Sequence, residues 1–248
     1  MTIKEMKPVE QLQCLLGEQY ISEDGEEYKV ELKPGLSDLQ LEDLSRRLPT
    51  GIIPGEIKEL LKFSSGFEFY GFEEITFDGV GQFGLEMLFP NSVQLAGDGF
   101  GNFWIIDVNN NGNWRNVFYV CHDPAVVVKH SDSLTQFIEH VNEFGKNGKN
   151  SNLDLIHEKI VMDIWKKEDG FVELENARQS SDRIVKDFAL SLPENFVIAD
   201  LRNKPNQSGF AWGKFGPNVE RARRHDSELL WGIERQVKKG FLSKLFGR

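Results

Sequence analysis

The pattern of apolar and polar residues divides the chain into a helical beginning, a strand-rich centre and a mixed end. The beginning has apolar residues at helical spacing, one capping box and one stretch in which apolar and charged residues alternate. These signals predict a helix at 9–16, a half-buried strand at 28–32, a helix that begins at Ser37 and ends before Pro49, and a helix that begins at Pro54 and stops at Gly66.

The centre consists of short apolar runs separated by Gly, Asn and Asp. Two of these runs, 103–106 and 117–120, are apolar on both faces, which is typical of central strands. We therefore expect Phe103 or Trp104 in the core and a hairpin loop at 109–113. In all, strands are predicted at 67–72, 74–77, 93–96, 103–108, 117–121 and 126–128, followed by a helix that begins at the capping box of Ser133 and Gln136 and is closed by Gly145.

Residues 146–152 contain no apolar side chain, so they are the predicted linker between a domain at 1–145 and an extension at 153–248. The order of the elements predicts an α+β fold, with a mixed or mainly antiparallel sheet flanked by helices, rather than alternating βαβ units. The extension is also expected to be α+β, with a helix from Leu153 to Gly170, a helix at 182–190, and strands at 196–201 and 209–215.

The last segment, Leu229–Arg248, carries apolar residues that can share one helical face and basic residues elsewhere. This pattern predicts a basic amphipathic tail, although Leu229–Ile233 alone is ambiguous between helix and strand. Three roles are open to it: packing on the protein's own core, filling a groove in a partner, or lying on an anionic membrane.

Charge is distributed unevenly along the chain. The whole sequence has a net charge of −10, but residues 200–248 carry +6 and residues 1–199 carry −16. An acidic body repels nucleic acid and attracts basic partners, so we expect a protein partner and no direct contact with nucleic acid. The sequence has no apolar run long enough to span a membrane and no secretory signal, and it has only two cysteines, which together favour a cytoplasmic location.

Three motifs could in principle bind a ligand or catalyse a reaction, but each has a simpler interpretation as a turn or a core position. Asp107–Gly112 matches the first half of a calcium loop, but Phe118 stands where the bidentate Glu is needed. Gly97–Gly101 lacks the third glycine and the following helix of a dinucleotide-binding loop. Cys121 and His122 are neighbours on a strand, so their side chains point to opposite faces. The sequence therefore predicts no catalytic residue, no metal and no cofactor. The less favoured alternative is an enzyme that uses Cys121 or the strand ends at Asp98 and Asp107.

Residues from about 32 to 145 resemble the SUKH superfamily, which includes fungal cell-wall-assembly regulators and bacterial toxin-immunity proteins. The order and spacing of several short pieces carry the resemblance: Leu48-Pro49, Ile53-Pro54, Ile57–Leu61, Ser65-Gly66, Leu95–Asp107, Val117–Asp123 and the helix from Ser133. Where family members often have Asp after the last loop glycine, this chain has Asn102. The resemblance implies an α+β domain that binds proteins without catalysis or cofactor.

These observations together predict a non-enzymatic protein-binding module. The favoured interpretation is an immunity-like protein that neutralises a toxin such as a basic nuclease, because an acidic inhibitor is steered toward a basic partner. The alternative is a regulatory or scaffold module that its basic tail recruits to a partner or membrane. The residues predicted to contact the partner are Asp98, Asn102, Asp107, Glu73 and Glu74.

Overall fold

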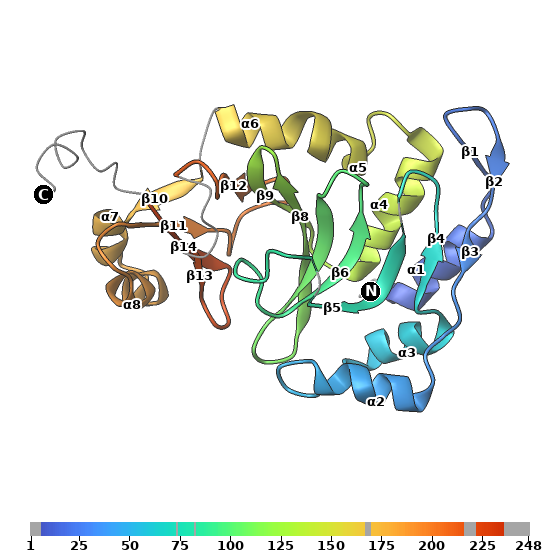
Figure 1. Ribbon diagram of the computed structural model, residues 1–248, viewed down its shortest axis with the longest axis horizontal. Coiled ribbons are helices and arrows are strands. Elements are labelled where there is room, and N and C mark those ends of the chain that lie inside the picture. The colour runs from blue at the N-terminus through green and yellow to red at the C-terminus, as the bar shows by residue number, and fades with distance from the viewer. Residues whose placement is uncertain (1–5, 73, 82, 167–169, 216–221, 236–248) are drawn as a thin grey trace, which may run out of the picture.

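The computed structural model describes residues 6–72, 74–81, 83–166, 170–215 and 222–235 and arranges them in layers (Figure 1). A large sheet lies in the middle, and helices cover one of its faces. A small sheet, backed by two helices of its own, covers the other face. The predicted α+β fold is confirmed.

The large sheet has eight strands, and every neighbouring pair in it is antiparallel. The strand order is β12-β9-β8-β7-β6-β5-β4-β3. The strands are β3 (Glu31–Leu32), β4 (Gly66–Glu68), β5 (Ile75–Val80), β6 (Ser92–Gly97), β7 (Phe103–Val108), β8 (Trp114–His122), β9 (Ala125–Ser131) and β12 (Gly209–Phe210).

The central strands β7 and β8 supply side chains to two separate cores. Trp104, Ile106 and Tyr119 point into the core under the helices, whereas Ile105 and Phe118 point into the core under the small sheet. Both faces of the large sheet are buried at this point, which explains why these strands are apolar throughout. The predicted central strand at 103–108 is confirmed, and Trp104 is its core aromatic with 5% of its surface exposed.

The helices on the first face come from parts of the sequence before, between and after the strands of the large sheet. Helices α1 and α4 pack against each other, and α1 also packs on α3. A π-helical turn joins α5 to α6 within one continuous helical segment. The bounds are α1 (Pro8–Leu16), α2 (Asp38–Arg46), α3 (Gly55–Phe63), α4 (Leu134–Asn147), α5 (Asn152–Leu155), the π turn (Ile156–Ile160) and α6 (Val161–Lys166).

Helix α2 begins at the predicted capping box. The Ser37 hydroxyl accepts a bond from the Gln40 backbone N–H, and the Gln40 side chain accepts one from the Ser37 backbone N–H. The prediction that Gly145 closes α4 is wrong, because the helix continues to Asn147 and Gly148 follows it. Gly145 instead permits close packing, since a Cβ at this position would collide with the rings of Tyr20 and Phe69.

The extension builds the small sheet, in the order β10-β11-β14-β13, and the two helices behind it. Trp231 is the largest fully buried side chain and lies between the two sheets, against Phe89, Phe118 and Phe210. The elements are β10 (Phe171–Glu173), α7 (Leu174–Arg178), α8 (Arg183–Ser191), β11 (Phe196–Asp200), β13 (Ala222–Arg224) and β14 (Leu230–Glu234).

Several predicted strands are shorter in the structure than in the prediction. The strand at 28–32 is two pieces, because β2 (Glu27–Tyr28) pairs with β1 (Tyr20–Ile21) in a separate hairpin and β3 pairs with β4. The strand predicted at 67–72 ends at Glu68, where the chain turns through Gly71 at a φ of 89°. The strand predicted at 209–215 ends at Phe210, and β10, α7 and β13 were not predicted.

The start of the predicted tail, which the sequence leaves ambiguous between helix and strand, is a strand. Residues 230–234 form β14, the strand between β11 and β13, and both neighbours pair with it. Bulky side chains that pack from both faces of a sheet favour this state over a helix. The rest of the predicted tail, residues 236–248, lies outside the described residues.

The segment predicted as a linker connects α4 to α5 through a short turn. Leu153, Ile156 and Val161, which follow it, belong to the same hydrophobic core as residues from α1 to α4. The helical segment 152–166 therefore packs on the large sheet, and the small sheet begins only at Phe171. The division of the chain at 146–152 stays a prediction.

Candidate interaction surface

The loop between β6 and β7 is held by one carboxylate. Asp98 Oδ1 accepts bonds from the backbone N–H groups of Phe100 (2.9 Å) and Asn102 (3.1 Å). Its Oδ2 accepts bonds from the Asn102 side chain (2.7 Å) and from the Tyr119 hydroxyl (3.0 Å). Burial opposes ionisation of Asp98, but these donors outweigh it and hold the pKa of Asp98 below its usual value.

Asn102 ties this loop to the end of β8. Its Oδ1 accepts bonds from the His122 backbone N–H (3.0 Å) and from the His122 ring Nδ1 (2.9 Å). The side chain of Asn102 is 2% exposed, so it cannot reach a partner in this structure. The Asn102 side chain is therefore not part of the exposed contact surface, and it supports the loop instead.

The tip of this loop is an exposed aromatic ring. Phe100 is 77% exposed, and it lies between Gly99 (φ 77°) and Gly101 (φ 84°). A side chain other than glycine rarely adopts these backbone angles. The interpretation of 97–101 as a tight turn that leads into a strand is confirmed.

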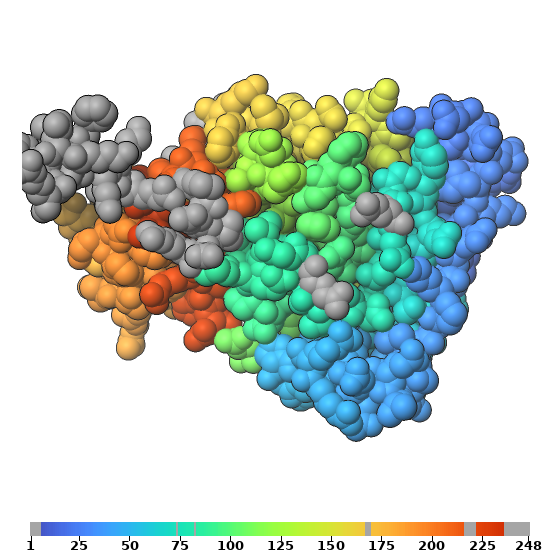
Figure 2. Space-filling view, viewed as in Figure 1, coloured from blue at the N-terminus to red at the C-terminus, as the bar shows by residue number. Residues whose placement is uncertain are grey.

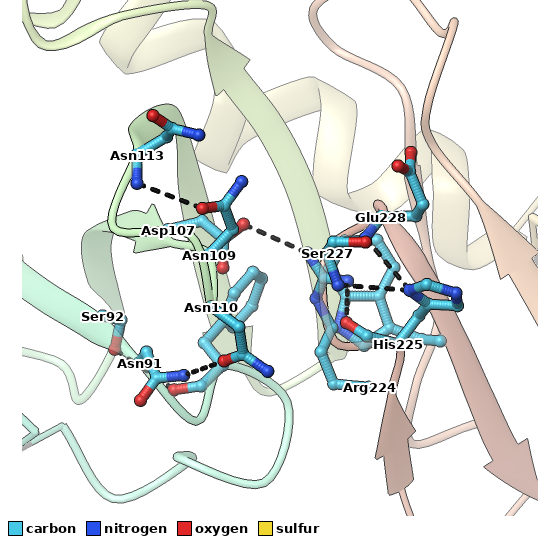
Figure 3. A network of polar contacts seen from close by, with 12 residues as sticks. Asn91, Ser92, Asp107, Asn109, Asn110, Asn113, Arg224, His225, Ser227 and Glu228 are labelled. Carbon is cyan, nitrogen blue, oxygen red and sulfur yellow. Dashed lines mark hydrogen bonds and ion pairs between the residues drawn. The ribbon is translucent and has the colours of Figure 1, made fainter. Parts of the chain in front are cut away.

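Asp107 lies at the junction between the large sheet and the extension (Figure 3). Its Oδ2 accepts a bond from the Arg224 guanidinium at 3.1 Å, and each of these side chains is only 6% exposed. The guanidinium also stacks on the Trp231 ring, with 4.3 Å from its carbon to the ring centroid. The prediction that Asp107 contacts a partner does not hold here, because this carboxylate is enclosed within the chain.

The hairpin loop at 109–113 is confirmed between β7 and β8. The Asn109 side chain stabilises it, since its Oδ1 accepts bonds from the backbone N–H groups of Asn111 and of Asn113, the second of which is drawn in Figure 3. Asn91, which precedes β6, donates a side-chain bond to Asn110 in the same loop. Oxygens that a calcium loop would direct at the ion are used here for turn bonds and for Arg224.

Cys121 and His122 point to opposite faces of β8, as their adjacency predicts. Cys121 is fully buried, and burial raises the pKa of its thiol to about 11, so it is a poor nucleophile. The His122 ring is exposed and lies against Gly101. Within the described residues, no three His, Cys, Asp or Glu side chains group closely enough to hold a metal ion.

His130, which is buried, and His140, which is half-buried, lie side by side between β9 and α4. His130 Nε2 lies 3.1 Å from His140 Nδ1, and the Ser131 hydroxyl lies within hydrogen-bond distance of both residues. Burial and the neighbouring His140 lower the pKa of His130 well below its usual value. Burial also lowers the pKa of His140, although Glu143 and Glu139 oppose that effect. Protonation of this pair therefore favours the unfolded chain.

We expect the free energy of unfolding to fall as the pH drops below about 6.5, because the unfolded chain then binds more protons than the folded one. Denaturant titrations of the wild type at several values between pH 7.5 and pH 5.5 measure this slope. In a His130→Gln variant the slope should flatten, whereas His157→Gln, at an exposed ring, should keep it. Equal slopes in the wild type and His130→Gln would contradict this assignment.

The densest group of carboxylates lies on residues 18–31, which we call the acidic hairpin. It includes β1 and β2 and projects at the end of the molecule away from the extension (blue in Figure 2). Within the described residues no cation pairs with Glu23, Asp24, Glu26 or Glu31, all of which are exposed. The hairpin also exposes 66% of Ile21.

Glu31 lies directly opposite a second carboxylate. It pairs in register with Glu68 across β3 and β4, and both residues are exposed. Like charges in this position destabilise a sheet, so this acidic surface costs local stability.

Of the predicted contact residues, Glu74 is exposed and forms an ion pair with Lys33, and Glu73 lies outside the described residues.

The acidic hairpin was missed as a site at the level of sequence. The signal is present, since residues 18–31 hold six Asp or Glu and one Lys. A charge run alone does not reveal whether its members will be neutralised by distant cations. Only the fold shows that Glu18 is paired, with Lys146, while the four carboxylates named above are not.

Comparison with known protein families identifies part of the chain. Residues 35–140 match the model of the SMI1 / KNR4 family (SUKH-1), which confirms the suspected SUKH domain. No curated protein and no solved structure matches the chain. The match spans α2 to the first half of α4, so the acidic hairpin and the extension both lie outside it. SUKH domains are protein-interaction modules and are generally not catalytic. Among the described residues, no helix has the length and apolarity needed to cross a bilayer.

Proposed function

We propose that this chain, built around a SUKH-1 domain, is a non-enzymatic immunity-like protein that binds and neutralises a basic toxin such as a nuclease. The observation that carries the proposal is the acidic hairpin. Four of its carboxylates are exposed and form no ion pair within the described residues. A surface of one charge sign steers a partner of the opposite sign and excludes partners of the same sign. The proposal places the chain in the cytoplasm, where a nuclease would act on nucleic acid.

The like-charged pair of Glu31 and Glu68 supports the same interpretation. An arrangement that costs stability in the free protein is understandable where a cationic partner removes the repulsion. The predicted contact residues Glu73 and Glu74 precede β5, and Asp98 supports the loop that carries Phe100. We keep Glu73 and Glu74 in the proposed contact surface, and Asp98 as the residue that supports its loop.

Capture on the full chain tests the proposal. The chain is immobilised, a lysate of its native cells is applied at about 0.01 M salt, and bound protein is eluted by raising the salt to about 0.1 M, over which the Debye length falls from about 30 Å to 10 Å. We expect a basic protein with nuclease activity that added chain inhibits. A chain that captures no basic protein at low salt, or that fails to inhibit the captured nuclease, would refute the proposal.

Charge reversal then locates the contact. The triple variant Glu23→Lys, Asp24→Lys, Glu26→Lys should slow association with the captured nuclease by about tenfold or more. The control triple Asp43→Lys, Glu56→Lys, Glu139→Lys changes the net charge equally at exposed sites outside the hairpin and should have a smaller effect. Equal slowing by both triples would assign the effect to net charge alone.

A second candidate function rests on the basic end of the sequence. Residues 200–248 carry a net charge of +6, which suits recruitment of a scaffold module to an anionic membrane. The two functions give opposite results on deletion of residues 240–248. Nuclease binding should survive the deletion, because this segment has the wrong charge for a basic partner, whereas recruitment to anionic vesicles should be lost.

A further inference from the structure

Phe100 is the most exposed of the large apolar side chains in the described part of the chain. Single exposed apolar residues are common on protein surfaces and by themselves indicate nothing. The loop that carries Phe100 is, however, closed by hydrogen bonds between its own residues. The Phe100 backbone N–H is itself a donor to Asp98, and the Asp98 backbone N–H donates to the Asn102 carbonyl.

This loop is fixed before any partner arrives. Asp98 accepts four bonds, and Asn102 connects the loop to His122 on the adjacent strand. Gly99 and Gly101 supply the left-handed backbone on both sides of Phe100. A side chain held on a rigid turn loses little conformational entropy on binding, which raises the affinity obtained for the surface it buries.

The projection of Phe100 points to a macromolecular partner. Small molecules bind in concave pockets, whereas this ring stands on a loop tip with most of its surface exposed. An anionic membrane is disfavoured because residues 1–199, which include the loop, carry a net charge of −16. A protein with an apolar pocket in a basic surface satisfies both requirements, and aromatic residues are the usual anchors of such contacts.

We propose that Phe100 is an anchor that inserts into an apolar pocket of a basic protein partner, with the Asp98 network holding the ring in its bound position. This inference rests on the proposed function, and it adds the residue and the complementary chemistry of the partner. Asp98 then acts as a positioning residue, since its carboxylate is occupied by donors within the loop.

Two variants of the full chain test the anchor with the captured basic nuclease as the probe. Phe100→Ser should weaken binding by at least about 30-fold, the loss expected for a central anchor. Leu39→Ser is the control. Leu39 is an aliphatic residue on α2 that is 72% exposed, and its replacement should weaken nuclease binding by less than about fivefold. Both variants should keep the wild-type melting temperature, because both side chains are exposed.

Photocrosslinking gives an independent measurement. A benzophenone amino acid at position 100 should crosslink to the nuclease, and the same group at position 39 should not. If the nuclease binds the wild type and Phe100→Ser with equal affinity, or if position 39 crosslinks as well as position 100, the anchor is refuted while the proposed function stands. If the wild-type chain binds no basic protein, both proposals fail.

Discussion

Replacing Trp231 with Ala should lower the free energy of unfolding of the whole chain by about 3–5 kcal/mol. The ring is fully buried between the two sheets, with its centroid 5.1 Å from that of Phe210 and 5.5 Å from that of Phe89. Its Nε1 donates a 2.7 Å bond to the Leu88 carbonyl, which connects the extension to the loop before β6. Alanine would leave a large cavity at this junction and an unsatisfied buried carbonyl.

Denaturant unfolding monitored by circular dichroism, together with hydrogen exchange, measures this effect. Trp231→Phe is the matched control, because it keeps an aromatic ring in the site but loses the bond to Leu88 and part of the buried ring; it should cost less than Trp231→Ala, about 1–3 kcal/mol. Because the apolar face of the large sheet depends on this contact, both sheets should lose protection together. Loss of protection only in 171–235, with 93–131 unchanged, would show instead that the extension folds as a separate unit.

The strands at the centre of the large sheet were the most predictable part of the fold. The bounds of β7, Phe103–Val108, agree with the prediction to the residue. The reason is physical, since a strand buried on both faces must be apolar throughout, and Gly and Asn mark the turns at its ends. The capping box at Ser37 was equally reliable, because its bonds join residues only three positions apart.

The extension was less predictable because distant residues decide its structure. Leu230 and Ile233 fit a helical face as well as a strand, and only pairing with β11 and β13 selects the strand. The short strands β10 and β13 have three residues each, too few to show a period. Local pattern therefore identified which parts of the extension were apolar, and long-range pairing determined their secondary structure.

The same distinction applies to the predicted contact residues. Asp107 and Asn102 lie in motifs that suggest exposed polar loops, yet partners far along the chain enclose both. Arg224 is 117 residues away from Asp107, and no spacing rule links them. Phe100 is the opposite case, an apolar residue that is exposed. Nothing in the sequence indicated this exposure, and the hydrogen bonds of its loop hold it at the surface as the proposed anchor.

Arg224→Met should destabilise the chain by about 3–5 kcal/mol, because it leaves the buried Asp107 carboxylate without its counterion. Burial already raises the pKa of Asp107, against the opposing effect of Arg224, so the unpaired carboxylate would be driven toward the neutral form. Asp107→Leu alone should cost a similar amount, since it leaves a guanidinium that is buried over the Trp231 ring.

The double variant Asp107→Leu, Arg224→Met separates the ion pair from simple loss of packing. Two apolar side chains of similar volume remove both desolvation penalties, so the double variant should be more stable than either single variant and close to the wild type. The exposed pair Arg183–Asp187 is the control, and Arg183→Ala should cost no more than about 1 kcal/mol. Denaturant unfolding of all five proteins gives the coupling energy between Asp107 and Arg224. Additive losses in the double variant would mean that the pair contributes nothing as a pair, and that Arg224 stabilises the junction only through its stacking on Trp231 and its bond to the His225 carbonyl.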